Sequence, residues 1–254
     1  MPKVVEIGTV SDVKKSTILE VIFEVRWQLT QVPNSPALRD PGYPLVYGRL
    51  YDRVKGRFPI VEDLPTTQVP PEANPYVVRH RLRKTKEGWP LMQIGPGIVT
   101  VNEGSEFEWK AFKEDASNGY EGVRQFFPSA QVPLKFLKVE LRFIHGYQFE
   151  GSATEFMAKS LNTQVKLDSA LFPADKVGDK QEGLLLNVGY TLKKPTGQGM
   201  LSFSLGQVEG KQAIVQQSLI QTAGEDTPQD LVELGRWLDD AHALATHWTK
   251  TLTK

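Results

Sequence analysis

The side chains of this sequence best suited to chemistry are four histidines and a row of arginines. His242 and His247 are candidate metal ligands, but five residues of helix separate them by roughly 140°, so they do not share a face. Asp239 and His242 have the spacing of a carboxylate-bridged metal site, yet the sequence holds no matching motif for a second helix. His145 and His80 fall in predicted strands, where packed or solvated histidines are common. The sequence predicts no metal site and no cofactor.

Three further motifs resemble catalytic or phosphate-binding sites only superficially. The segment Glu209-Gly210-Lys211 matches the Glu-x-Lys of metal-dependent nucleases, but it lies between two strand patterns and predicts a tight turn. The glycines of 95–97 and 197–199 precede strands, whereas a phosphate loop leads into a helix. The sequence assigns no catalytic residue, and an enzyme whose site is assembled from single residues across the fold stays an alternative.

The segment 79–86, Arg-His-Arg-Leu-Arg-Lys-Thr-Lys, is the most unusual local feature. Alternation places Arg79, Arg81 and Arg83 on one strand face and predicts that they face solvent or a partner, with His80 and Leu82 on the other side. Three guanidinium groups in a row suit phosphates or carboxylates. We expect them to pair with carboxylates on neighbouring strands, and phosphate binding is the alternative.

Composition limits the kinds of partner. The chain of 254 residues has 30 basic and 30 acidic side chains, so no overall field attracts nucleic acid or an anionic membrane. It contains no cysteine, which excludes disulfides and thiolate sites. Residues 1–15 hold no apolar run of signal-peptide length, and no segment approaches the ~20 apolar residues that span a bilayer. We expect a cytoplasmic protein without a membrane segment.

The hydrophobic pattern predicts an α+β fold. Residues 19–29 alternate apolar and polar side chains, as a half-buried strand does, and a short helix follows from Tyr43. Strands are predicted at about 77–83, 89–94 and 98–102, then a helix within 107–127. In the C-terminal region, strands at about 184–193, 200–206 and 212–222 precede a helix over 228–250 that buries its apolar stripe: Leu231, Leu234, Leu238, Ala241, Ala245 and Trp248.

The two halves of the chain share a pattern. The segments 23–27 and 139–143 both read apolar, Glu, aliphatic, Arg, aromatic, with an offset of 140 − 24 = 116 residues. A helix and three strands follow each segment. The sequence therefore predicts tandem β-α-β-β-β-α halves, 1–130 and 131–254, related by a pseudo-twofold axis in one curved, mainly antiparallel sheet with helices on one face.

The segments Glu20–Trp27, Leu141–Ile144 and Leu238–His242 resemble a sporadically distributed family of uncharacterised prokaryotic proteins. The resemblance implies no activity and supplies no catalytic residue, while sporadic occurrence is typical of mobile, accessory or defence-related genes. The duplicated layout is also similar to the saddle of TATA-binding proteins, a likeness of topology alone.

These features favour a non-enzymatic binding or regulatory protein that uses the sheet face free of helices. We expect the two matching strands to pair antiparallel, with Glu24 near Arg142 and Arg26 near Glu140 on that face. A protein partner is expected there. The alternative is a nucleic-acid or nucleotide-binding protein that uses the row from Arg79 to Arg83.

Overall fold

A computed structural model describes residues 17–130, 132–166, 168–173, 175–178 and 182–253. Residues 1–15, on which the expectation of no signal peptide rests, lie outside these ranges. No helix among the described residues is long and apolar enough to cross a membrane.

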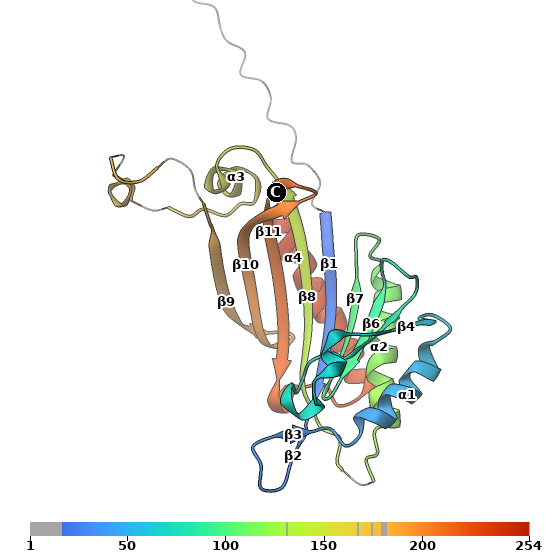
Figure 1. Ribbon diagram of the computed structural model, residues 1–254. Helices are drawn as coiled ribbons and strands as arrows, with labels where there is room; N and C mark the ends of the chain where they lie inside the picture. The colour runs from blue at the N-terminus through green and yellow to red at the C-terminus, as the bar shows by residue number, and fades with distance from the viewer. Residues whose placement is uncertain (1–16, 131, 167, 174, 179–181, 254) are drawn as a thin grey trace, which may run out of the picture.

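The centre of the fold is a nine-stranded sheet in the order β4-β5-β6-β7-β1-β8-β11-β10-β9, with every neighbouring pair antiparallel (Figure 1). Its strands are β1 (Thr17–Trp27), β4 (Ile60–Asp63), β5 (His80–Arg83), β6 (Leu91–Gly95), β7 (Ile98–Glu103), β8 (Phe136–Gln148), β9 (Leu185–Lys193), β10 (Thr196–Val208) and β11 (Lys211–Ala223). A separate hairpin pairs β2 (Thr30–Gln31) with β3 (Leu38–Arg39).

The helices are α1 (Tyr43–Val54), α2 (Trp109–Phe126), α3 (Ala153–Ser160) and α4 (Leu231–Leu252). Short 3-10 turns occur at Pro65–Gln68 (η1), Pro71–Ala73 (η2), Ser169–Leu171 (η3) and Gly224–Asp226 (η4). The α+β class, the antiparallel sheet and the C-terminal helix are confirmed.

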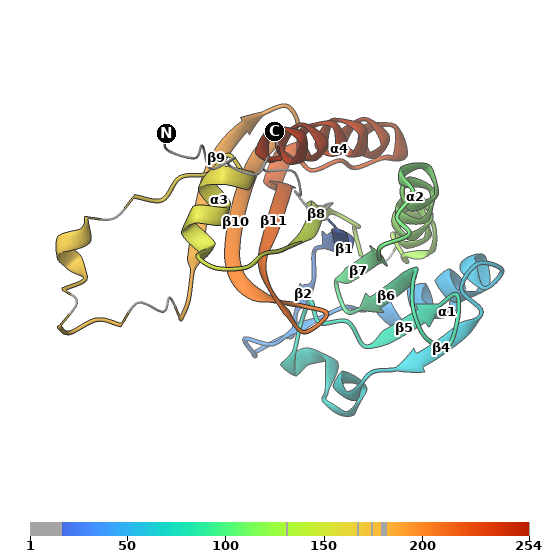
Figure 2. The same ribbon diagram turned by 90° about the horizontal axis from the view of Figure 1, so that it is seen from above.

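The helices share one face of the sheet. Viewed from above, α1, α2 and α4 lie along the same side of the curved sheet (Figure 2). The side chains of Val21, Phe23, Val25 and Trp27 are fully buried on this side, in one cluster with the apolar residues of α1, α2 and α4. A second cluster joins α3 to β8, β10 and the end of α4. Strand alternation thus assigns a buried face and an uncovered face.

The predicted apolar stripe of the last helix is largely right. Leu234, Leu238, Ala241 and Ala245 are buried. Leu231 is 36% exposed and Trp248 is only partly buried. Trp237, one turn from both Leu234 and Ala241, is buried in addition, and its indole Nε1 donates to Thr222 Oγ1 at 2.7 Å.

The two matching strands, β1 and β8, are neighbours at the centre of the sheet and pair antiparallel as expected. Their register differs from the expected one, because Glu24 lies directly opposite Glu140 and Arg26 lies opposite Lys138. The reciprocal ion pairs expected between Glu24 and Arg142 and between Arg26 and Glu140 are therefore wrong.

His145 is a titratable group packed into the buried face. Its side chain lies on β8 between Phe143 and Tyr147, opposite Gln216 of β11, and the residue is 4% exposed. Burial lowers the pKa of His145 to about 4, although the contact with Gln216 acts in the opposite direction. His145 is therefore neutral at pH 7 and has the character of a core residue.

We predict that His145 makes the fold sensitive to acid. Because the pKa is about 4 when folded and 6.5 when exposed, the unfolded chain binds more protons in this interval, so stability falls as the pH falls from 6.5 to 4. The loss approaches ~1.4 kcal/mol per pH unit. Urea unfolding of His145→Gln between pH 7 and 4.5 should show a shallower loss. His247→Gln, on the exposed side of α4, should keep the original slope.

Candidate functional site

The uncovered side of the sheet, here called the open face, carries a central cluster of charges. Glu24 and Arg26 reach it from β1, and Lys138, Glu140 and Arg142 reach it from β8. Lys138 Nζ lies 2.9 Å from Glu24 Oε1 and 2.8 Å from Glu140 Oε2. Lys138 thus bridges the two carboxylates that the register places opposite each other.

The outer members of this cluster bond along their own strands. Arg26 Nε lies 2.7 Å from Glu24 Oε1, and the guanidinium of Arg142 donates to Glu140 Oε1. The Arg26 guanidinium also lies over the ring of Tyr76, 5.4 Å from its centroid. The cluster holds three cations and two anions, and its polar atoms are largely bonded to one another.

The pKa of Glu140 reflects the opposing effects of burial and of its cationic neighbours. Burial tends to raise the pKa of this carboxyl, whose side chain is only 4% exposed. The hydrogen bonds and charges of Lys138 and Arg142 outweigh burial, and the pKa lies below its ordinary value. The carboxylate stays ionised because its cationic neighbours are fixed in place.

The central carboxylates belong to a polar row that crosses all nine strands at right angles. Each member lies directly opposite the next in the register of the sheet. From β4 to β9, this transverse row consists of Glu62, Arg81, Gln93, Thr100, Glu24, Glu140, Gln221, Gln198 and Thr191. With strands ~4.8 Å apart, it extends for about 38 Å.

Hydrogen bonds hold the members of the row in place. In the first half, Arg81 Nε donates to Gln93 Oε1 at 3.0 Å, and Gln93 Nε2 donates to Thr100 Oγ1 at 3.3 Å. In the second half, Gln221 Nε2 donates to Gln198 Oε1 at 3.1 Å. Gln198 and Thr191 are exposed, whereas Thr100 and Glu140 are buried by their neighbours. The row is therefore a line of side chains held by hydrogen bonds, and its exposed members lie at the β9 end.

The predicted arginine row divides into two parts. Arg81 and Arg83 reach the open face, and both contact Glu62 Oε2 of β4, at 3.3 and 2.7 Å. This is the expected pairing with a carboxylate on a neighbouring strand. Arg79 departs from the prediction of exposure because it is 8% exposed and donates to the carbonyls of Thr67 and Val69. It anchors the loop that contains η1.

His80 and Leu82 point away from the open face, as predicted. Leu82 is fully buried, and the ring of His80 stacks on Tyr47 of α1 with centroids 4.0 Å apart. His242 similarly stacks on Trp109, with centroids 3.9 Å apart, and burial lowers its pKa. Both histidines join helices to their neighbours by ring packing.

Two hollows lie beside the β9 end of the transverse row. One of 530 Å³ is lined by Gln198, Met200, Leu219 and Gln221 together with residues 189–191 and 199. An adjoining hollow of 370 Å³ shares Thr191, Gln198 and Gln221. Gly197-Gln198-Gly199, expected to precede a strand, instead lies within β10, and this places Gln198 on the open face.

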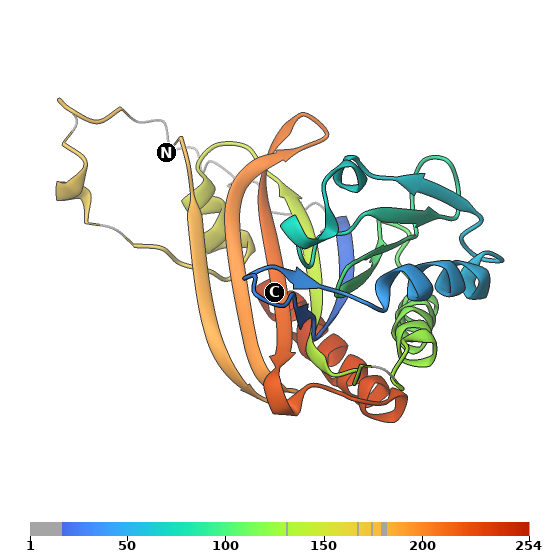
Figure 3. The same ribbon diagram turned by 60° about the horizontal axis from the view of Figure 1, so that its bottom comes forward.

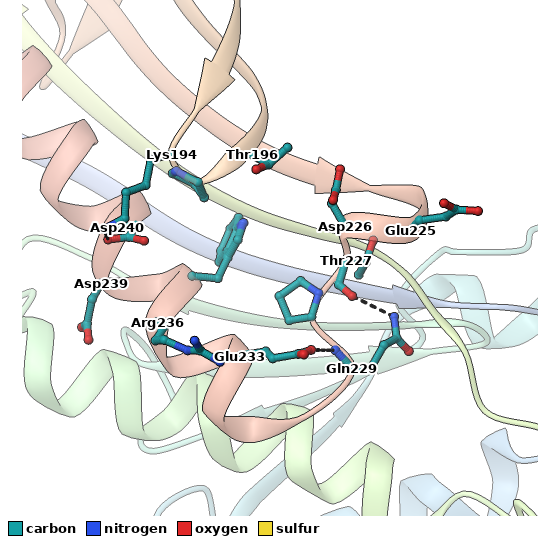
Figure 4. A pocket seen from close by; sticks show the side chains of 13 residues that line it. Lys194, Thr196, Glu225, Asp226, Thr227, Gln229, Glu233, Arg236, Asp239 and Asp240 are labelled. Carbon is teal, nitrogen blue, oxygen red and sulfur yellow. Dashed lines mark hydrogen bonds and ion pairs between the residues drawn. The ribbon is translucent and has the colours of Figure 1, made fainter.

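A larger hollow of 790 Å³ lies beside the first turns of α4 (Figure 4). Lys194 and Asp240 form an ion pair of 3.2 Å at one side of it, and Glu233 accepts a hydrogen bond from the backbone N–H of Gln229. Five of its thirteen lining residues are acidic, namely Glu225, Asp226, Glu233, Asp239 and Asp240. Among the described residues, no group of three His, Cys, Asp or Glu side chains is arranged to hold a metal ion.

No protein-family model matches the sequence, and no curated protein matches it significantly. The description of the site therefore rests on its geometry.

Sequence analysis missed much of this surface. Lys138, Gln93, Gln198 and Gln221 were not among the candidate residues, although alternation within each strand would place them opposite the apolar positions. The pattern within a strand does not give the register between strands. That register aligns the polar positions of nine strands in one row.

We predict that Lys138→Met destabilises the fold by about 2–4 kcal/mol at pH 7, because Glu24 and Glu140 would face each other without their shared cation. In the wild type, the lowered pKa of Glu140 contributes stability above pH 4.5 that is lost as the pH falls. In the variant, repulsion raises this pKa, so protonation relieves the strain and the deficit should shrink at pH 5.

Urea unfolding at pH 7 and 5 measures both effects. Lys135→Met is the matched control, since Lys135 is exposed next to β8. An equal deficit for the two variants, or one independent of pH, would contradict the bridging role of Lys138.

Proposed function

We propose that this chain is a non-enzymatic binding protein that takes a protein partner on the open face along the transverse row. The observation that carries the proposal is the row itself, an ordered line of polar side chains across nine strands. Ordered groups lose little conformational entropy on binding. Helices fill the other face, so the open face is the side of the sheet that a partner can reach, above all at the β9 end, where Gln198 and Thr191 are exposed.

A protein partner fits the composition of this face better than a polyanion. The charges of the central cluster are mixed and already paired, and the adjoining row contains Met200, Leu219 and Ile22. Polar groups interspersed with apolar side chains are typical of protein interfaces. Binding to phosphate backbones is driven by uniform positive charge. In the central cluster, the cations are instead paired with Glu24 and Glu140.

We further propose that the surface arose by tandem duplication, with halves 1–130 and 131–254 forming a saddle similar to that of TATA-binding proteins. Outward from the centre the strands run β1-β7-β6-β5 on one side and β8-β11-β10-β9 on the other. Helices α1 and α3 follow the first strand of each half, and α2 and α4 end each half. Glu24 and Glu140, equivalent by the 116-residue offset, lie opposite each other, where a pseudo-twofold axis would pass.

The resemblance to a sporadically distributed prokaryotic family supports an accessory or defence-related role in the cytoplasm. Such a role suits a protein that acts by binding, since a duplicated sheet provides a large surface without a catalytic centre.

Two glutamines of β10 test the use of the open face. Both are exposed, but Gln198 lies on the open face and Gln207 points to the opposite face. The partner is to be identified by mass spectrometry of material that co-purifies with the native protein, and its affinity is then measured by calorimetry. We predict that Gln198→Arg weakens binding about tenfold or more, equivalent to ~1.4 kcal/mol. Gln207→Arg should leave it unchanged, and equal effects would remove the open face as the binding site.

The second candidate is a nucleic-acid or nucleotide-binding protein, which one observation favours. Arg81 and Arg83 are two guanidinium groups against the single carboxylate of Glu62, so this end of the open face carries an excess positive charge, while the buried Arg79 is held by loop carbonyls. Phosphates would have to replace the contacts that Arg81 and Arg83 make with Glu62.

Oligonucleotide titrations at several salt concentrations separate the two candidates. If the alternative holds, Arg81→Gln should weaken binding and reduce the slope of log K against log salt by about one. Arg124→Gln, which removes an exposed guanidinium bonded to Glu121 on α2, is the matched control. Salt-independent binding, or equal behaviour of the two variants, would contradict the alternative.

A further inference from the structure

The two edges of the sheet are built differently. The edge strand β4 has four residues, two of them acidic, and lies between Pro59 and Pro65. A short, charged strand bounded by prolines discourages the addition of another strand. This edge is protected against pairing.

The opposite edge strand, β9, is longer and less charged, although Pro195 follows its end at the same spacing as Pro65 follows β4. Its nine residues, Leu185–Lys193, contain no proline and a single charge, Lys193. It pairs with β10 on one side, and no other described element lies beside its outer edge (Figure 3). Leu185 is 73% exposed and Tyr190 is 51% exposed. A long, largely apolar edge with a single charge at its end is a template for a further strand.

Exposed apolar side chains concentrate in β9 and in the segment of the chain that precedes it. Of the eleven exposed large apolar residues among those described, five lie within 171–190: Leu171, Phe172, Val177, Leu185 and Tyr190. The first three belong to the connection between α3 and β9, whose turn η3 lies well away from the sheet in two views (Figures 1 and 2). The exposed apolar side chains of this connection are available to pack against a second molecule beyond β9.

The sequence of β9 is complementary to itself. In an antiparallel pair centred on Gly189, Val188 lies opposite Tyr190 and Leu186 opposite Leu192 on the helix side. Asn187 lies opposite Thr191 on the open face, and Lys193 lies opposite Leu185, so no like charges meet. Gly189 would lie opposite its own copy with no side chain between the backbones.

We propose that β9 pairs antiparallel with β9 of a second copy of this chain, across a twofold axis at Gly189. The axis is perpendicular to the sheet, so both open faces lie on the same side. The two nine-stranded sheets then form one continuous sheet, and Thr191 at the end of one transverse row adjoins Asn187 of the other copy. This interface is separate from the proposed partner site and does not depend on it.

The absence of cysteine from the chain permits a direct test of the register. A β-carbon at Gly189 would meet nothing within 4 Å, and directly opposed residues of an antiparallel pair lie ~4.5–5.5 Å apart, within the range of a disulfide. Under mild oxidation, Gly189→Cys should form a covalent dimer on a non-reducing gel. Leu185→Cys, which would lie opposite residue 193, and Val61→Cys on the protected edge β4 should stay monomeric.

Sedimentation of the untagged chain provides the second measurement. The wild type should sediment at twice the chain mass of 28.5 kDa. Val188→Lys should shift it to the monomer because the charge would face Tyr190, while Val61→Lys on β4 should leave the dimer intact. Far-ultraviolet circular dichroism checks that each variant is folded. A monomeric wild type, or a dimer in which Gly189→Cys crosslinks no faster than the two control cysteines, would overturn the proposal.

Discussion

The central constraint of this fold is that Glu24 and Glu140 lie directly opposite each other. The apolar alternation of β1 and β8 fixes the face of every side chain in both strands, and a slip of one residue would expose Phe23 and Leu141. The register that satisfies burial places two carboxylates together on the opposite side. Lys138 contacts both carboxylates and reduces their repulsion. Arg26 pairs with Glu24, and Arg142 pairs with Glu140. The centre of the sheet therefore depends on one shared cation.

The outer strands take their positions from this pair. Since β7 pairs with β1 and β11 pairs with β8, their side chains inherit the division into a buried and an open face. The helices cover the buried face, where Phe23 and Leu141 need apolar neighbours. The open face carries most of the polar positions of these strands, together with a few apolar residues such as Leu91, Ile98 and Leu219 that their neighbours bury. The transverse row thus follows from the central register together with the registers of the seven strand pairs outside it.

Sequence alone predicted the features that depend on local pattern. The alternation of residues 19–29 and 136–143 predicted two central strands, and the three-and-four spacing from Leu234 to Ala245 predicted the last helix. Features that depend on distant contacts could not be predicted. Arg79 is buried because the loop carrying η1 folds over it, and the carbonyls that it contacts, those of Val69 and Thr67, lie 10 and 12 residues away in a separate segment.

The two ends of the transverse row differ in whether a further strand can pair beside them. At β4 the row ends at Glu62, whose carboxylate is already shared by Arg81 and Arg83 on a strand too short and too charged to pair further. At β9 it ends at Thr191, which is exposed beside two hollows on a strand with a free outer edge. A protein that used only its own open face would gain nothing from leaving one edge unprotected. The difference between the edges is explained if the β9 end is where a second sheet continues the first.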